Sequence, residues 1–78
     1  MMSNLFRLRG AENARKQLYD RCEEAIHSVG ITDEIRREIK EIRARTGTMN
    51  PVIEGSARVL KQVTSDLERL ENLLARSR

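Results

Sequence analysis

The residues of this chain that could do chemistry together lie close in sequence, between positions 22 and 27. Glu24 and His27 have the Glu-x-x-His spacing with which helical di-iron proteins place two metal ligands on an inward helix face. Cys22 and His27 are the residue types of a nucleophile and its general base. On a helix, however, Glu24 and His27 lie about 140 to 200° away from Cys22, which belongs to the apolar stripe. We therefore expect a small core residue at Cys22 and solvent-exposed side chains at Glu24 and His27, with no catalytic, metal-binding or cofactor-binding site.

A second group of candidate residues is cationic. Arg36, Lys40 and Arg43 would align along one edge of an isoleucine stripe if residues 33–45 form a helix. Near the N-terminus, a further basic group consists of Arg7, Arg9, Arg15 and Lys16. Such side chains could contact phosphates or an acidic partner surface. The chain carries 15 Lys and Arg against 12 Asp and Glu, and this small, interspersed excess does not by itself predict nucleic-acid binding.

The elements that must position these residues are three predicted helices, at residues 11–28, 33–45 and 51–76. Apolar residues recur every three or four positions in each of them, which indicates one buried face per helix. Thr32 is a suitable N-cap for the second helix, and Asn50 followed by Pro51 is a typical start for the third. Gly47 is expected to follow the end of the second helix. Residues 1–10 are interpreted as a basic and apolar tag, flexible or a helix extension, in front of a single helical domain at 11–78.

Composition supports an all-α fold. The chain has 78 residues, 35% of them charged, and its aromatic residues are one Phe and one Tyr, whereas β-rich folds are richer in aromatic residues. We predict a small bundle of three helices with the third the longest. A core of this size is marginal, and a lone cysteine excludes an internal disulfide. Oligomerisation is therefore expected to complete the fold.

The predicted helix lengths locate the interface. At 1.5 Å per residue, the third helix would span roughly 40 Å and the second only about 20 Å. An antiparallel second helix would then cover half of the third, and the alanine-rich first helix is expected to be too thin to cover the rest. The competing expectation is a compact monomer in which the first helix does cover it. The predicted interface consists of the late leucines and flanking valines: Leu67, Leu70, Leu73, Leu74, Val52 and Val59.

The function that follows is a non-enzymatic protein–protein interaction module, acting as an adaptor, chaperone-like binder or regulator. Its expected partner is a second copy, most simply in a homodimer with coiled-coil-like packing, or another helical protein. The alternative is a nucleic-acid-binding module that uses the basic edge of the second helix and the N-terminal Arg/Lys group. The single cysteine and the lack of a secretory leader favour a cytoplasmic location, and no apolar run is long enough to span a membrane.

Overall fold

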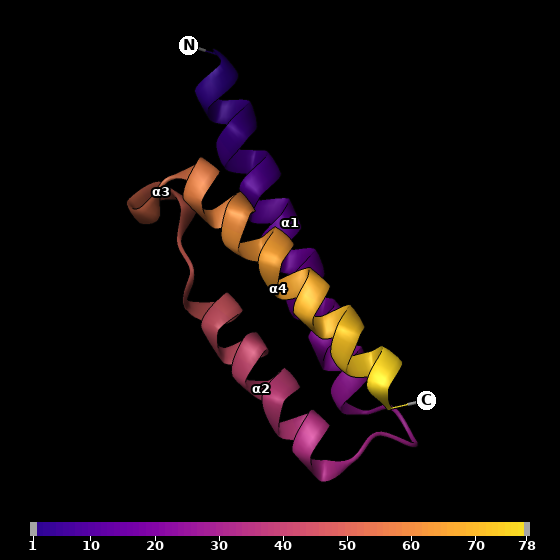
Figure 1. The fold of residues 1–78 in the computed structure, drawn as a ribbon. Helices are drawn as coiled ribbons and strands as arrows, with labels where there is room; N and C mark the ends of the chain where they lie inside the picture. Colours follow the sequence, from indigo (N-terminus) through magenta and orange to yellow (C-terminus); the bar gives the residue numbers. More distant parts are fainter. Residues whose placement is uncertain (1, 78) are drawn as a thin grey trace.

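The computed structural model describes the backbone of residues 2–77 and the side chains of residues 6–77, and four helices make up most of it (Figure 1). They are α1 (Met2–Ile26), α2 (Asp33–Thr48), α3 (Pro51–Glu54) and α4 (Ser56–Arg76). Residues 2–77 contain no strand, so the predicted all-α fold is confirmed. The helix count differs, because the predicted third helix is divided into α3 and α4. The first helix begins nearer the N-terminus than predicted, so the expected tag is helical from Met2 onward; Met1 and Arg78 lie outside the described residues.

The helices form an elongated bundle of 46 × 19 × 16 Å (Figure 1). Helices α1 and α4 run in the same direction, and α2 runs antiparallel to both. Both α2 and α4 pack mainly on α1, while the contact between α2 and α4 is smaller. Helix α1 is therefore the central element of the fold, and its narrow, alanine-rich face lets both neighbours approach closely.

The starts of α2 and α3 are set by local caps, as predicted. The Thr32 hydroxyl accepts a hydrogen bond from the backbone N–H of Ile35 at 3.2 Å. Likewise, the Asn50 side-chain oxygen accepts from the N–H of Val52 at 3.0 Å, with Pro51 in the first turn. Each cap provides an acceptor for an amide that has no partner within its own helix.

The end of α2 differs from the prediction. The helix continues through Gly47 to Thr48, so the expectation that it ends at 45 with Gly47 beyond it is wrong. Gly47 instead provides room for a neighbour, because a Cβ at this position would lie only 3.3 Å from the ring of Tyr19 on α1. The missing side chain thus allows the last turn of α2 to pack against α1.

Gly55 separates α3 from α4. Its φ of +97° lies in the region that side chains with a Cβ rarely adopt, and this conformation turns the chain between the two helices. Helix α3 therefore does not continue the axis of α4 but projects from the end of the bundle (Figure 1). The apolar residues of α3 leave the line of the α4 stripe at this point.

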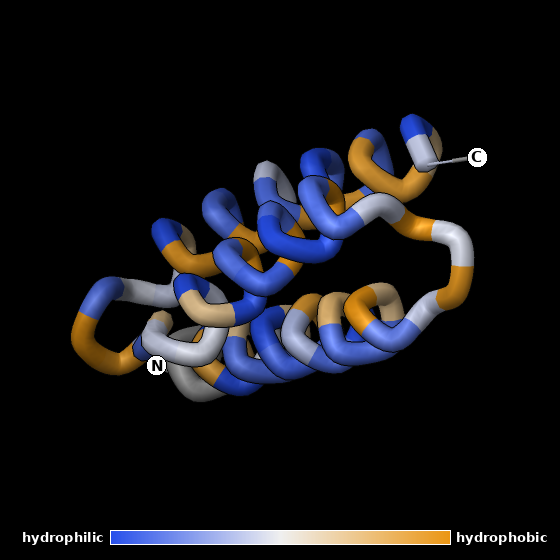
Figure 2. Tube along the Cα trace, turned by 90° about the horizontal axis from the view of Figure 1, so that it is seen from below, coloured by the Kyte–Doolittle hydropathy of each residue, from blue (hydrophilic) through white to orange (hydrophobic). Residues whose placement is uncertain are grey.

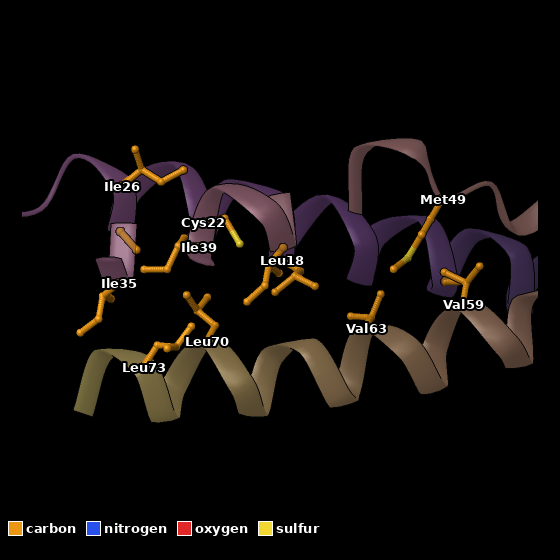
Figure 3. Close-up of a cluster of buried hydrophobic side chains, with 13 residues drawn as sticks. Leu18, Cys22, Ile26, Ile35, Ile39, Met49, Val59, Val63, Leu70 and Leu73 are labelled. Atoms are coloured by element: carbon orange, nitrogen blue, oxygen red, sulfur yellow. The ribbon is translucent and has the colours of Figure 1, made fainter. Parts of the chain in front are cut away.

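The core is a single cluster enclosed by α1, α2 and α4. Apolar side chains turn inward from all three long helices, while the outward positions are hydrophilic (Figures 2 and 3). Its largest fully buried members include Leu18, Ile39, Ile42 and Leu70. Cys22 lies among them, as predicted. One protomer therefore assembles a contiguous core from its own helices.

The late leucines are covered within this core, which corrects the premise of the predicted interface. Leu70 and Leu73 are 0% and 3% exposed, and Val59 is buried as well. Leu67 and Leu74 are partly buried against the same cluster. The lengths explain the error: α2 has 16 residues and α4 only 21, or roughly 24 and 32 Å, so the mismatch is far smaller than predicted. Helix α1 covers what α2 leaves open.

Candidate functional site

The residues first considered for chemistry lie apart. Glu24 and His27 are exposed, and the His27 imidazole faces Glu23, with 3.8 Å between Nε2 and Oε2. Cys22 is fully buried; burial raises the pKa of its thiol to about 11, and the nearby Asp66 carboxylate adds to the shift. A thiol with this pKa is protonated and unreactive at neutral pH. Among residues 2–77, no three His, Cys, Asp or Glu side chains gather closely enough to hold a metal ion.

The predicted basic edge of α2 is mostly engaged within the protein. Arg36 Nε donates to the carbonyl oxygen of Ile26 at 2.9 Å and so caps the end of α1, while its Nη1 donates to Asp33. Arg43 Nη1 donates to the Glu23 carboxylate, which links α2 to α1. Lys40 is exposed and has no ion pair among the described side chains. Two of the three predicted cations therefore stabilise the packing of α2 on α1.

A buried carboxylate that the sequence analysis missed joins α4 to α2. Asp66 is almost fully buried and accepts hydrogen bonds from Arg45 Nη2 at 2.6 Å and from Gln62 Nε2 at 3.1 Å. Asp66 lies three residues after Val63 and four before Leu70, so the helical spacing puts it on the buried face of α4. A carboxylate at such a position needs a cation, and Arg45 near the end of α2 is one, so the sequence contained enough information to predict the pair. Its partners satisfy the carboxylate, so the cluster is structural.

Three of the five large apolar side chains that are exposed among residues 6–77 lie at the end of the bundle formed by the first turns of α1 and by α3, hereafter the α1–α3 end; the other two are Leu60 of α4 and Val29, which follows α1. Val52 and Ile53 of α3 are 77% and 80% exposed, and Phe6 of α1 is 67% exposed. Helix α1 continues about nine residues beyond Ala11, the first fully buried residue among the side chains of 6–77, and projects past the rest of the bundle (Figure 1). The sequence analysis predicted a contact role for Val52 and placed Phe6 in the basic and apolar tag of residues 1–10, but it gave Ile53 no contact role.

A groove lies between α1 and α3 at this end. Its volume is about 420 Å³, and Leu8, Pro51 and Val52 form the apolar part of its lining. Arg9, Glu12, Asn13 and Asn50 provide polar groups around them. Pro51 is buried beneath the groove, and the Asn50 cap fixes the orientation of α3. The concave surface is thus built on two positioned helices.

The charge around the α1–α3 end is mainly positive. Arg7 and Arg9 on α1, and Arg58 and Lys61 in the first turns of α4, are exposed, and none of the four forms an ion pair with the side chains of residues 6–77. The acidic groups nearby are already bonded. Glu54 accepts from the backbone N–H of Asn50 at 2.9 Å, and Glu12 accepts from Arg15, which also lowers the Glu12 pKa. Glu54 keeps its negative charge, because its donor is a neutral amide, so the four cations against this one carboxylate leave the end with a net positive charge.

Comparison with known proteins gives no relative from which a function could be inferred, so the structural features above are the basis for the assignment of a site. No protein-family model, curated protein sequence or solved structure matches this chain. Within the part that the structure describes, no helix is both long and apolar enough to cross a membrane. The α1–α3 end is accordingly the best-defined candidate site, since it combines exposed apolar side chains, a groove and available cations.

Proposed function

We propose that this chain is a non-enzymatic protein–protein interaction module that contacts its partner through the α1–α3 end. The exposure of Val52 and Ile53, at 77% and 80%, is the observation that carries the proposal. Two adjacent β-branched apolar side chains in a capped, positioned helix give the protein no benefit in water. Fully burying each of them against a partner would gain roughly 1.5 to 3 kcal/mol.

The partner that these features support best is a different, helical protein. The homodimer expected from the sequence was to be formed through the late leucines, which the protomer itself covers. A homodimer through the α1–α3 end would bring Arg7 and Arg9 of one copy near those of the other, and like charges oppose that approach. An adaptor or regulator that binds a separate protein avoids this repulsion.

A nucleic-acid-binding role has less support. Arg36 donates hydrogen bonds to Ile26 and Asp33, and Arg43 donates to Glu23. The residue of the basic edge of α2 that remains available to phosphates is therefore mainly Lys40. The remaining cations lie beside apolar groups that a phosphate backbone would not bury. The combination of apolar and cationic side chains is more typical of a protein-binding surface.

Site-specific photo-crosslinking in the cells from which the chain comes tests the proposal. A photoreactive phenylalanine analogue at Ile53 is expected to give a protein adduct that depends on ultraviolet light. The matched control places the same analogue at Glu41, an exposed position on α2, where no adduct of that mass is expected. Equal adducts at both positions, or none at Ile53, would refute the proposed contact surface.

A further inference from the structure

We infer that the α1–α3 end binds an acidic amphipathic helix of its protein partner. This inference rests on the proposed function and specifies the chemistry of the partner. Three observations carry it: the concave shape of the surface, the length of helix that it leaves free, and the sign of the surrounding charge.

The shape favours inserted side chains over a flat surface. The apolar lining from Leu8, Pro51 and Val52 lies in a groove of about 420 Å³, between the long helix α1 and the single turn of α3. A planar surface such as a lipid bilayer would touch the rim of this groove and leave its lining unfilled. One or two large apolar side chains of a partner helix fit a groove of this size, as in the recognition of an amphipathic helix by a hydrophobic groove.

The dimensions set the length of the bound helix. About nine residues of α1 lie beyond Ala11, which corresponds to roughly 14 Å of helix. A partner helix lying along this segment would present two and a half turns, with anchor side chains three, four or seven positions apart. Its anchors would enter the groove and contact Val52, while its outer turn would reach Phe6.

The charge determines which helix is favoured. Arg7 and Arg9 on α1 and Arg58 and Lys61 in the first turns of α4 outnumber the carboxylates of Glu12 and Glu54 at this end, and Glu12 is paired with Arg15. A partner helix with Asp or Glu beside its anchors would pair with these cations, whereas a basic helix would be repelled. A second copy of this chain would bring the same four cations to the interface.

Selection from a displayed library of helical peptides tests the inference with the full chain as the target. Enriched peptides are expected to carry a net negative charge and at least two large apolar residues three or four positions apart. Their dissociation constants are expected to rise roughly tenfold or more for Val52→Ser/Ile53→Ser and for Arg7→Gln/Arg9→Gln, and to rise with added salt. Lys40→Gln, an exposed cation on α2, serves as the matched control and should change binding less than about twofold.

All of these substitutions are at exposed positions, so far-ultraviolet circular dichroism should be unchanged. Enrichment of neutral or basic peptides, or binding insensitive to the Arg7→Gln/Arg9→Gln change, would overturn the inference. So would the absence of enriched peptides combined with sedimentation on anionic phosphatidylglycerol vesicles, which would assign the surface to lipid. A dimer in sedimentation that Val52→Ser/Ile53→Ser dissociates would assign it to a second copy.

The two proposals fail in different ways. If Ile53 gives a specific protein adduct but the selected peptides are not acidic, the interaction function stands and the partner chemistry is wrong. If Ile53 gives no specific adduct in cells, the proposed function itself falls, whatever the library yields.

Discussion

Ionisation of the buried Cys22 thiol should destabilise the protein at alkaline pH. The thiol lies in the core, where burial raises its pKa from an ordinary 9.0 to about 11. That value includes a smaller upward contribution from the Asp66 carboxylate on α4 and opposing contributions from Arg43 on α2 and Arg21 on α1. In the unfolded chain the thiol is in water and loses its proton near its ordinary pKa. Folding therefore favours the protonated form.

The sign and the size of the effect follow from that difference in pKa. Below about pH 9 both states hold the proton, and the thiol contributes no pH dependence. Between about pH 9 and pH 11 the unfolded chain has lost the proton that the folded chain keeps, so the free energy of unfolding falls as the pH rises. The slope approaches about 1.4 kcal/mol per pH unit, or roughly 2 to 3 kcal/mol over this range. That is a large part of the roughly 4 to 12 kcal/mol expected for a chain of this length.

Urea denaturation followed by circular dichroism, in steps from neutral to strongly alkaline pH, would measure this effect. The comparison is with Cys22→Ala, which lacks the thiol and keeps the rest of the chain unchanged. The variant should be less stable at neutral pH, by about 1 kcal/mol, and should lose less stability as the pH rises. Parallel curves for the two proteins would refute the reasoning, because the thiol would then ionise alike in both states.

Two further predictions concern the core. Leu70→Ala should lower the free energy of unfolding by about 2 to 5 kcal/mol, because Leu70 is fully buried. The urea midpoint of the unchanged protein should be the same at low and high protein concentration; a midpoint that rises with concentration would show that self-association contributes to its stability. Asp66→Ala should cost about 1 to 3 kcal/mol in thermal unfolding, because it removes the acceptor of Arg45 and Gln62. An equal effect of Glu68→Ala, an exposed carboxylate on α4, would contradict this role.

The features that the sequence predicted correctly are local ones. Thr32 and Asn50 cap their helices through side-chain bonds to amides two or three residues ahead, so their role depends little on the rest of the fold. The burial of Cys22 followed from its place in a periodic stripe. Patterns confined to a few turns of one helix were sufficient for these features.

The coverage of the late leucines could not be predicted in this way, because it depends on how three helices align. Ending α2 early and starting the last helix at Pro51 overstated the difference in their lengths, and the conformation of Gly55 corrects it. Leu70 is buried because α1 and α4 run parallel, which is a long-range property. Small errors at two helix ends therefore led to the expectation that one protomer leaves its late leucines uncovered.

The roles of the arginines were hidden for a similar reason. Arg36 and Arg43 have the spacing of a cationic stripe, but their acceptors are on α1, at Ile26 and Glu23. Only the folded arrangement shows that these bonds are intramolecular. The exposure of Ile53 was hidden in the same way, because this residue lies within the range 51–76 predicted as one helix and becomes exposed where α3 turns away at Gly55.

The parallel course of α1 and α4 places the first and last described residues at opposite ends of the 46 Å long axis (Figure 1). A purification tag or fluorescent reporter fused after the last residue would therefore sit far from Phe6, Val52 and Ile53. One fused before the first residue would lie next to them and would compete with any ligand. Pull-down assays with the two fusion orders should thus give different results, and the carboxyl-terminal fusion is the suitable bait.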